Sequence, residues 1–167
     1  MLEKYFFEND KLIILDENLD INISSSLKVE LKYIFYSTGS IKAKMHYYKN
    51  VLHGTSSFFD KDNNLISISY YYLGKKFGKS YKYYKSKKLY SIEQYIDDKL
   101  EKEQKYFYEN GSLKTCLFYI EGVLHKGSLF YENKKIKRSF KLKGNKVIEN
   151  KLFDIREKPI DESKFKL

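Results

Sequence analysis

The chain has 167 residues, too few for two ordinary domains, so we expect one domain or a short repeat array. Its single cysteine, Cys116, excludes an internal disulfide, and no apolar run approaches the roughly 18 residues of a membrane-spanning helix. The net charge is +10, and because 17% of the residues are aromatic while alanine occurs only at Ala43, the composition predicts an all-β protein.

Residues 1–35 are predicted to form an acidic leader. Residues 1–30 hold seven acidic residues against three lysines, a net charge of −4, which leaves +14 on the rest of the chain. The segment Tyr5–Leu12 (YFFENDKL) is similar to Tyr106–Leu113 (YFYENGSL), so we expect a degenerate first repeat that caps the array. The start of the chain lacks the basic and then apolar regions of a secretory signal, and the expected location is the cytoplasm.

From residue 36 to residue 153, apolar and turn residues recur every 24 positions. Two columns hold over four units: Ile41, Leu65, Leu89 and Leu113, and Tyr47, Tyr71, Tyr95 and Tyr119. Two turn columns keep the same phase: Gly39, Asn63, Lys87 and Gly111, and Gly54, Gly78, Lys102 and, one residue late, Gly127. The predicted units are 36–59, 60–83, 84–107, 108–130 and 131–153, the last one degraded.

Each unit is predicted to be a β-hairpin. Residues 41, 43, 45 and 47 are Ile, Ala, Met and Tyr, and polar residues alternate with them, as in a strand with one apolar face. In the unit 108–130, we expect a turn from Glu121 to Gly127 and then a shorter strand, Ser128 to Tyr131. Because one hairpin cannot bury its apolar face, neighbouring hairpins should stack into an elongated antiparallel sheet with a continuous strip of core. The tail, residues 154–167, should be a short helix or an irregular segment.

Lysine and tyrosine are densest between residues 75 and 90, and no acidic residue occurs from Asn63 to Ile92. Such a patch either attracts anionic surfaces or simply keeps a tyrosine-rich sheet soluble. We interpret the tyrosine column at 47, 71, 95 and 119 as core, which leaves the other tyrosines beside the lysines as better binding candidates. The candidate binding residues are Lys75, Lys76, Lys79, Tyr81, Lys82, Tyr83, Tyr84, Lys85, Lys87, Lys88 and Tyr90.

No pattern predicts catalysis, a cofactor or a metal. The segment Gly74–Ser80 (GKKFGKS) falls one residue short of a phosphate-binding loop, and the residues after it are strand-like rather than helical. His53 and His125 occupy equivalent turn positions in separate units, so we expect solvated turn residues. We expect Cys116 to be a small, half-buried apolar group. The acidic pair Asp97-Asp98 is interpreted as a hairpin turn, not as a catalytic carboxylate pair.

The motif Tyr108–Lys114 (YENGSLK), followed by Tyr119–Gly122 (YIEG) and Gly127, resembles the MORN repeat, and most closely its bacterial variant. The resemblance extends over about residues 36–153, although Asn63, Lys87 and Lys102 replace turn glycines. It implies a single-layer twisted sheet of successive hairpins that binds or scaffolds without chemistry of its own. It also implies, for bacterial members, an antitoxin or immunity role and, for eukaryotic members, contact with membrane phospholipid or other proteins.

The leading hypothesis is a cytoplasmic, non-enzymatic protein-binding module, such as the antitoxin or immunity partner of a toxin encoded nearby. The alternative is a peripheral binder of anionic phospholipid or nucleic acid through residues 75–90. Neither hypothesis needs a cofactor or a small-molecule substrate.

Overall fold

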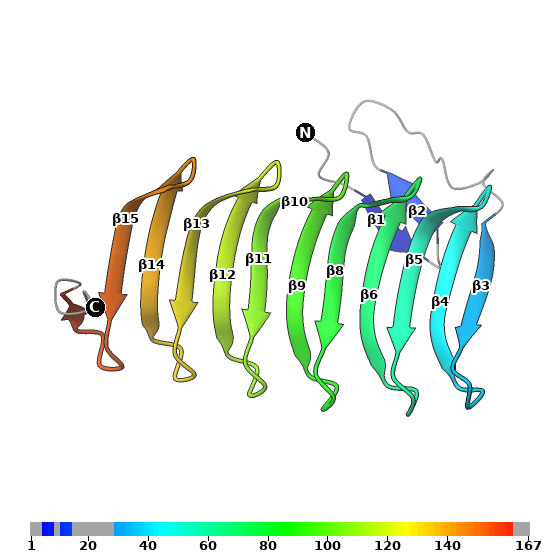
Figure 1. The fold of residues 1–167 in the computed structure, drawn as a ribbon, viewed down its shortest axis with the longest axis horizontal. Helices are drawn as coiled ribbons and strands as arrows, with labels where there is room; N and C mark the ends of the chain where they lie inside the picture. Colours follow the sequence, from blue (N-terminus) through cyan, green and yellow to red (C-terminus); the bar gives the residue numbers. More distant parts are fainter. Residues whose placement is uncertain (1–4, 9–10, 15–28, 162–167) are drawn as a thin grey trace.

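The computed structural model describes residues 5–8, 11–14 and 29–161, and the regular structure in these ranges is entirely β (Figure 1). A two-stranded sheet consists of β1 (Tyr5–Glu8) and β2 (Lys11–Ile14). All other strands form one open antiparallel sheet of 14 strands, in which neighbours in the sheet follow chain order. This confirms the predicted all-β array of tandem hairpins.

The strands of the large sheet are β3 (Glu30–Phe35), β4 (Ile41–Tyr48), β5 (Val51–Phe59), β6 (Leu65–Tyr72), β7 (Lys75–Lys76), β8 (Gly78–Tyr83), β9 (Leu89–Ile96), β10 (Lys99–Leu100), β11 (Lys102–Phe107), β12 (Leu113–Ile120), β13 (Val123–Phe130), β14 (Ile136–Lys143), β15 (Lys146–Phe153) and β16 (Pro159–Ile160). The short strands β7 and β10 pair with β6 and β9, beside β8 and β11 respectively. The described residues contain no helix that is long and apolar enough to cross a membrane.

Five-residue turns join the hairpins at the lower end of the sheet in Figure 1. The first residue of each turn donates its N–H to the carbonyl of the fifth, and the fourth donates to the carbonyl of the first. The fourth residue always has a positive φ: Gly39, Asn63, Lys87, Gly111, Lys134 and Glu157. The first turn column is therefore confirmed and continues through two further turns, although only two of its six members are glycines.

Two-residue turns close each hairpin at the opposite end. In four of these turns both residues have a positive φ, the geometry that matches the twist of the flanking strands: Lys49-Asn50, Leu73-Gly74, Asp97-Asp98 and Glu121-Gly122. In the fifth, Gly144-Asn145, only the glycine has a positive φ. The expected long turn from Glu121 to Gly127 is wrong, because β13 begins at Val123 and Gly127 lies inside it, opposite Leu117. The second glycine column instead lies within strands or at their starts, where Gly54, Gly78 and Lys102 have a positive φ and Gly127 does not.

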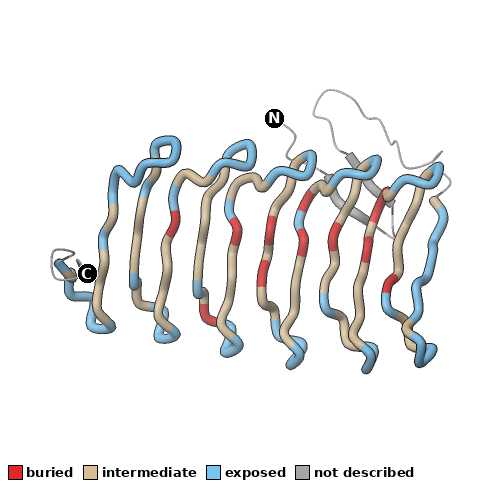
Figure 2. The backbone as a smooth tube through the Cα atoms, in the orientation of Figure 1, coloured by how far each residue is buried: buried red, intermediate tan, exposed pale blue. Residues whose placement is uncertain are grey.

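A continuous apolar core strip is also wrong, because the sheet has a single layer. Ala43 is the only buried hydrophobic side chain among the described residues. The tyrosine column is only half-buried, so its interpretation as core is wrong as well. Most buried side chains are polar and lie near the middle of the strands (Figure 2): Ser56, Ser69, Ser80, Ser91, Glu93 and Gln104.

The two ends of the chain depart from the predicted scheme. Residues 154–158 form a sixth five-residue turn, and β16 then pairs with β15, so no helix occurs in 154–161. The rest of the tail, 162–167, lies outside the described residues. Leu12 of the leader corresponds to Leu113 of the similar repeat, but the two leucines pair differently. Leu12 pairs with Phe7 in the separate β1–β2 sheet, whereas Leu113 pairs with Phe107, which corresponds to Phe6.

Candidate binding surface

The strand register gives the sheet two unlike faces, since directly paired residues of antiparallel strands point to the same side. One face, here called the lysine face, carries a continuous row across ten strands. Its members are Lys44, Ser57, Ile68, Tyr81, Ile92, Lys105, Cys116, Ser128, Ser139 and Lys151. The other, here called the serine face, carries Ser56, Ser69, Ser80, Ser91, Glu93 and Gln104.

The serine face is closed by its own hydrogen bonds around Glu93, which is 5% exposed. The Glu93 carboxylate accepts hydrogen bonds from Lys82 Nζ at 3.0 Å, the Tyr95 hydroxyl at 2.9 Å and the Tyr106 hydroxyl at 3.3 Å. These donors come from three neighbouring strands, β8, β9 and β11. Burial, together with the adjacent carboxylate, raises the pKa of both tyrosines well above the ordinary value of 10.0.

Gln104 closes the same face beside Glu93 and is fully buried. Its amide oxygen accepts from the backbone N–H of Gln94 at 2.7 Å, and its amide nitrogen donates to the Glu101 carbonyl at 2.8 Å. The side chain thus supplies hydrogen bonds where the strand is interrupted between β10 and β11. Sequence reasoning missed both Glu93 and Gln104, because each also binds groups on other strands that become neighbours only through the register: Lys82 and Tyr106 for Glu93, and Gln94 for Gln104.

The lysine face is open by comparison. In the middle of its central row, Ile68, Tyr81 and Ile92 stand side by side on β6, β8 and β9, and all three are half-buried. Burial raises the pKa of Tyr81. Lysines flank this apolar centre, with Lys44 and Lys105 in the same row and Lys79 in the next. An apolar centre inside a charged rim is the usual composition of a protein-binding surface.

The predicted binding residues do not form one patch. Lys79 and Tyr81 lie on the lysine face, Lys82 lies on the serine face, and Lys75 is bound to Asp97 at 2.6 Å beside the upper turn. Lys76 lies near the same upper end with its ammonium over the Tyr95 ring, and Tyr83 is the last residue of β8. The lower turn and the strand after it hold the remainder: Tyr84, Lys85, Lys87, Lys88 and Tyr90.

Tyrosines of the lower turns tie neighbouring units together. Each donates its hydroxyl to the carbonyl that precedes the next lower turn, at 2.7–2.9 Å: Tyr36 to Phe59, Tyr84 to Phe107, Tyr108 to Phe130 and Tyr131 to Phe153. Asp60 takes the place of the tyrosine in the remaining unit and instead accepts from Asp62 and Asn64 within its own turn. Tyr84 is therefore a structural residue, and its hydroxyl is already engaged.

Comparison with known proteins agrees with this repeat geometry. Residues 100–121 match the family model described as MORN repeat variant. The matched segment begins at the end of β10 and includes all of β11 and β12. No curated protein matches the chain closely enough to suggest a relative. MORN repeats are generally non-catalytic binding repeats that contact proteins or membrane lipids, which agrees with the open face described above.

The two histidines considered for metal binding or acid-base catalysis both lie within strands of the sheet. His53 is 3% exposed, so the prediction of a solvated turn residue is wrong for it, because it lies in β5 between the rings of Tyr48 and Tyr72. Burial lowers its pKa, and its Nδ1 accepts the Leu73 N–H at 3.4 Å. His125 is half-buried in β13. No three His, Cys, Asp or Glu residues of the described chain gather as metal ligands.

Two further sequence interpretations are confirmed. Asp97 and Asp98 form a two-residue turn, where the carboxylate of Asp98 accepts the N–H of Lys76 at 2.7 Å. The segment Gly74–Ser80 runs through a turn and into β8, with Gly78 at the start of that strand, so it forms no loop before a helix.

Proposed function

We propose that the chain is a non-enzymatic protein-binding module that contacts its partner with the lysine face. The observation that carries this proposal is the apolar row of Ile68, Tyr81 and Ile92, which lies at the centre of the lysine face with lysines on both sides. The serine face is a poorer candidate, because the Glu93 carboxylate already binds the polar groups around it. The Ser56 and Ser91 hydroxyls have no hydrogen-bond partner among the described residues, but both side chains are fully buried and out of a partner's reach. A partner that complements this face carries an apolar patch with acidic residues around it.

We further propose a toxin as that partner and the cytoplasm as the location, on the strength of the resemblance to bacterial MORN-type antitoxin components. The alternative partner, anionic phospholipid or nucleic acid, would contact residues 75–90. That alternative is weakened by the division of those lysines between both faces and both ends of the sheet.

The decisive experiment compares two tyrosines on opposite faces. The chain is co-expressed with the product of the neighbouring open reading frame, and the affinity of the purified pair is measured by calorimetry. Tyr81→Ala removes the centre of the lysine face and should weaken binding by about tenfold or more. Tyr71→Ala is the matched control, since Tyr71 is also half-buried but lies on the opposite side, level with Gly54.

Circular dichroism must first show that both variants fold. A loss of affinity for Tyr71→Ala alone would assign binding to the serine face and overturn the proposal. Salt distinguishes the alternative, because binding to lipid phosphates or nucleic acid should weaken steeply as salt is added, whereas a protein interface with an apolar centre and few ion pairs should weaken much less.

A further inference from the structure

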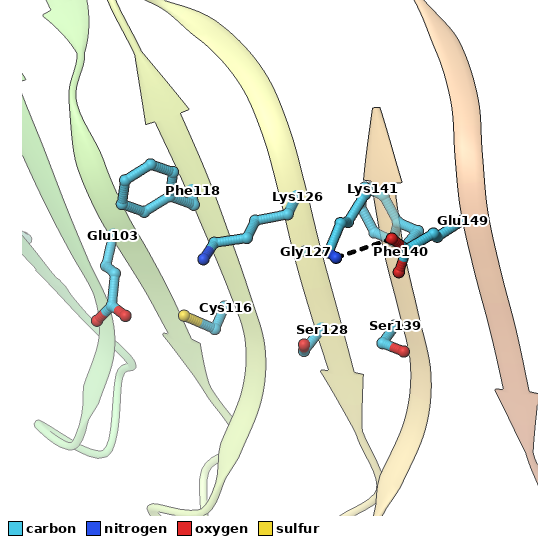
Figure 3. A pocket seen from close by; sticks show the side chains of 10 residues that line it. All are labelled: Glu103, Cys116, Phe118, Lys126, Gly127, Ser128, Ser139, Phe140, Lys141 and Glu149. Atoms are coloured by element: carbon cyan, nitrogen blue, oxygen red, sulfur yellow. Dashed lines mark hydrogen bonds and ion pairs between the residues drawn. The ribbon is translucent and has the colours of Figure 1, made fainter. Parts of the chain in front are cut away.

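A pocket of about 280 Å³ lies on the lysine face over β11 to β15 (Figure 3). Its floor is formed by Cys116, Ser128 and Ser139, which are direct neighbours across β12, β13 and β14. The Lys126 and Lys141 side chains stand beside this floor, again as direct neighbours. The pocket is separate from the apolar centre at Tyr81 but lies on the same face.

The hollow exists because small side chains replace large ones in this part of the central row. Three strands in the middle of the sheet contribute Ile68, Tyr81 and Ile92 to the row, whereas β12, β13 and β14 contribute a cysteine and two serines. The lost side-chain volume on three adjacent strands leaves room for a group from outside. A volume just below the range of drug-sized ligand sites suits a side chain or a small ion.

The pocket offers hydrogen-bond donors that have no acceptor among the described residues. Ser128 and Ser139 are register partners, and neither hydroxyl makes a hydrogen bond within the described residues. The Lys126 ammonium lies 4.9 Å from the centre of the Phe118 ring. No carboxylate of residues 29–161 forms an ion pair with it. Two hydroxyls and one ammonium together can bind the two oxygens of a carboxylate.

The other charges at the pocket are neutralised in pairs. Lys141 binds Glu149 at 2.8 Å on one side, and Glu103 binds Lys105 at 3.0 Å on the other. Among the charged residues that line the pocket, this leaves one uncompensated positive charge, at Lys126. A single negative charge balances it, whereas a doubly charged phosphate would also meet the carboxylates of Glu103 and Glu149.

We propose that this pocket binds a carboxylate, the group that an acidic side chain of the protein partner would supply. That the carboxylate comes from a protein partner rests on the function proposed above, whereas the binding of a carboxylate in the pocket does not depend on that function. Lys126 neutralises the charge, and Ser128 and Ser139 donate hydrogen bonds to the carboxylate oxygens. The partner would thus be held at two places on the lysine face, by apolar contact at Tyr81 and by this ion pair.

Cys116 provides a built-in reporter, because its thiol lies on the pocket floor (Figure 3). Iodoacetate and iodoacetamide alkylate a thiolate in the same way and have nearly the same size, but only iodoacetate carries a carboxylate. Burial and the nearby Glu103 carboxylate raise the pKa of the Cys116 thiol, and Lys105 and Lys126 partly oppose that effect. The ratio of the two alkylation rate constants cancels the thiolate fraction and reports only the preference for the carboxylate.

The ratio for the full chain should exceed that of N-acetylcysteinamide, a free thiol without a carboxylate of its own, by about threefold or more, the size of a partly screened ion pair. Lys126→Gln should abolish this excess, and Ser128→Ala with Ser139→Ala should reduce it. Lys61→Gln is the matched control, since Lys61 is an exposed lysine in a distant turn. A ratio equal to that of the free thiol would overturn the proposal, as would a ratio insensitive to the serines, which would indicate only long-range attraction by a basic protein.

The affinity of the protein partner is the second readout. Lys126→Gln should weaken the complex by about three- to fivefold, whereas Lys61→Gln should leave it unchanged. If the alkylation ratio is as expected but Lys126→Gln leaves partner binding intact, then the pocket binds carboxylates without serving the interface, and the partner's part of the proposal is overturned. The result for Tyr81→Ala does not depend on either outcome, so failure of the pocket and failure of the proposed function are separable.

Discussion

Replacing Glu93 with alanine should destabilise the middle of the sheet. The carboxylate accepts two tyrosine hydroxyls and the Lys82 ammonium, all at 2.9–3.3 Å. Each tyrosine bond is worth about 1 kcal/mol, and the Lys82 pair less, because the Lys82 side chain is 45% exposed and water replaces its partner. The variant also leaves a gap where the buried side chain was, so the total loss in the free energy of unfolding should be about 2–4 kcal/mol.

Glu103→Ala is the matched control, since Glu103 also lies in a central strand but is 55% exposed and binds only Lys105. It should change the free energy of unfolding by no more than about 0.5 kcal/mol. Urea unfolding followed by circular dichroism measures both variants, with the slope of the transition required to stay constant. Equal effects of the two substitutions would refute the reasoning. If Glu93→Ala does not fold, Glu93→Gln should still cost about 1 kcal/mol.

Three further predictions test the ties within the sheet. Tyr108→Phe removes the 2.9 Å hydrogen bond to the Phe130 carbonyl and should lower the free energy of urea unfolding by about 0.5–1.5 kcal/mol. Tyr33→Phe, on the exposed edge strand, should leave it unchanged, and equal losses for the two variants would show that the hydrogen bond does not stabilise the sheet. Gly127→Ala would place a methyl group 2.5 Å from the Phe140 ring, so thermal unfolding should show a loss of about 1–3 kcal/mol, and an unchanged midpoint would contradict the close packing. The two tyrosines bound to Glu93 have a raised pKa, so unfolded tyrosine ionises first as the pH rises past 10.0; their contribution to stability is full below that pH and is lost above it. Urea midpoints from pH 8 to pH 11 should therefore fall more steeply for the wild type than for the variant with both tyrosines changed to phenylalanine, and parallel curves would refute this.

The sequence predicted the fold well because the features that define a unit are local. A five-residue turn requires a left-handed residue at its fourth position, and that requirement recurs every 24 residues up to Gly111 and every 23 after it, whether or not glycine fills the position. Asn63 and Lys87 therefore kept the phase visible despite the missing glycines. The long turn predicted up to Gly127 failed because that glycine serves a different need, the close approach of the Phe140 ring across the sheet.

The proposed binding surface was less predictable, because a surface on a sheet is built from residues far apart in sequence. Successive residues of one strand point to opposite faces, so the contiguous lysines and tyrosines of residues 75–90 were divided between the two sides. The lysine-face row takes one residue from each strand, and its neighbours in space are about a dozen positions apart in the chain. Only the register assigns Ser128 and Ser139 to one pocket floor.

A single-layer sheet has no second layer packed against it, so its strands must be held in place by contacts within the sheet itself. The serine face supplies order, since Glu93 and Gln104 fix neighbouring strands through buried hydrogen bonds. The tyrosine ties at the lower turns, and backbone bonds such as that from Gly74 to the Leu52 carbonyl, fix the units at both ends. Because the strands are already held, a partner that binds the proposed surface would not need to order them, and the free energy of contact at Tyr81 would be retained as affinity. The hydrogen bonds of the serine face thus stabilise the sheet without any layer having to cover the lysine face.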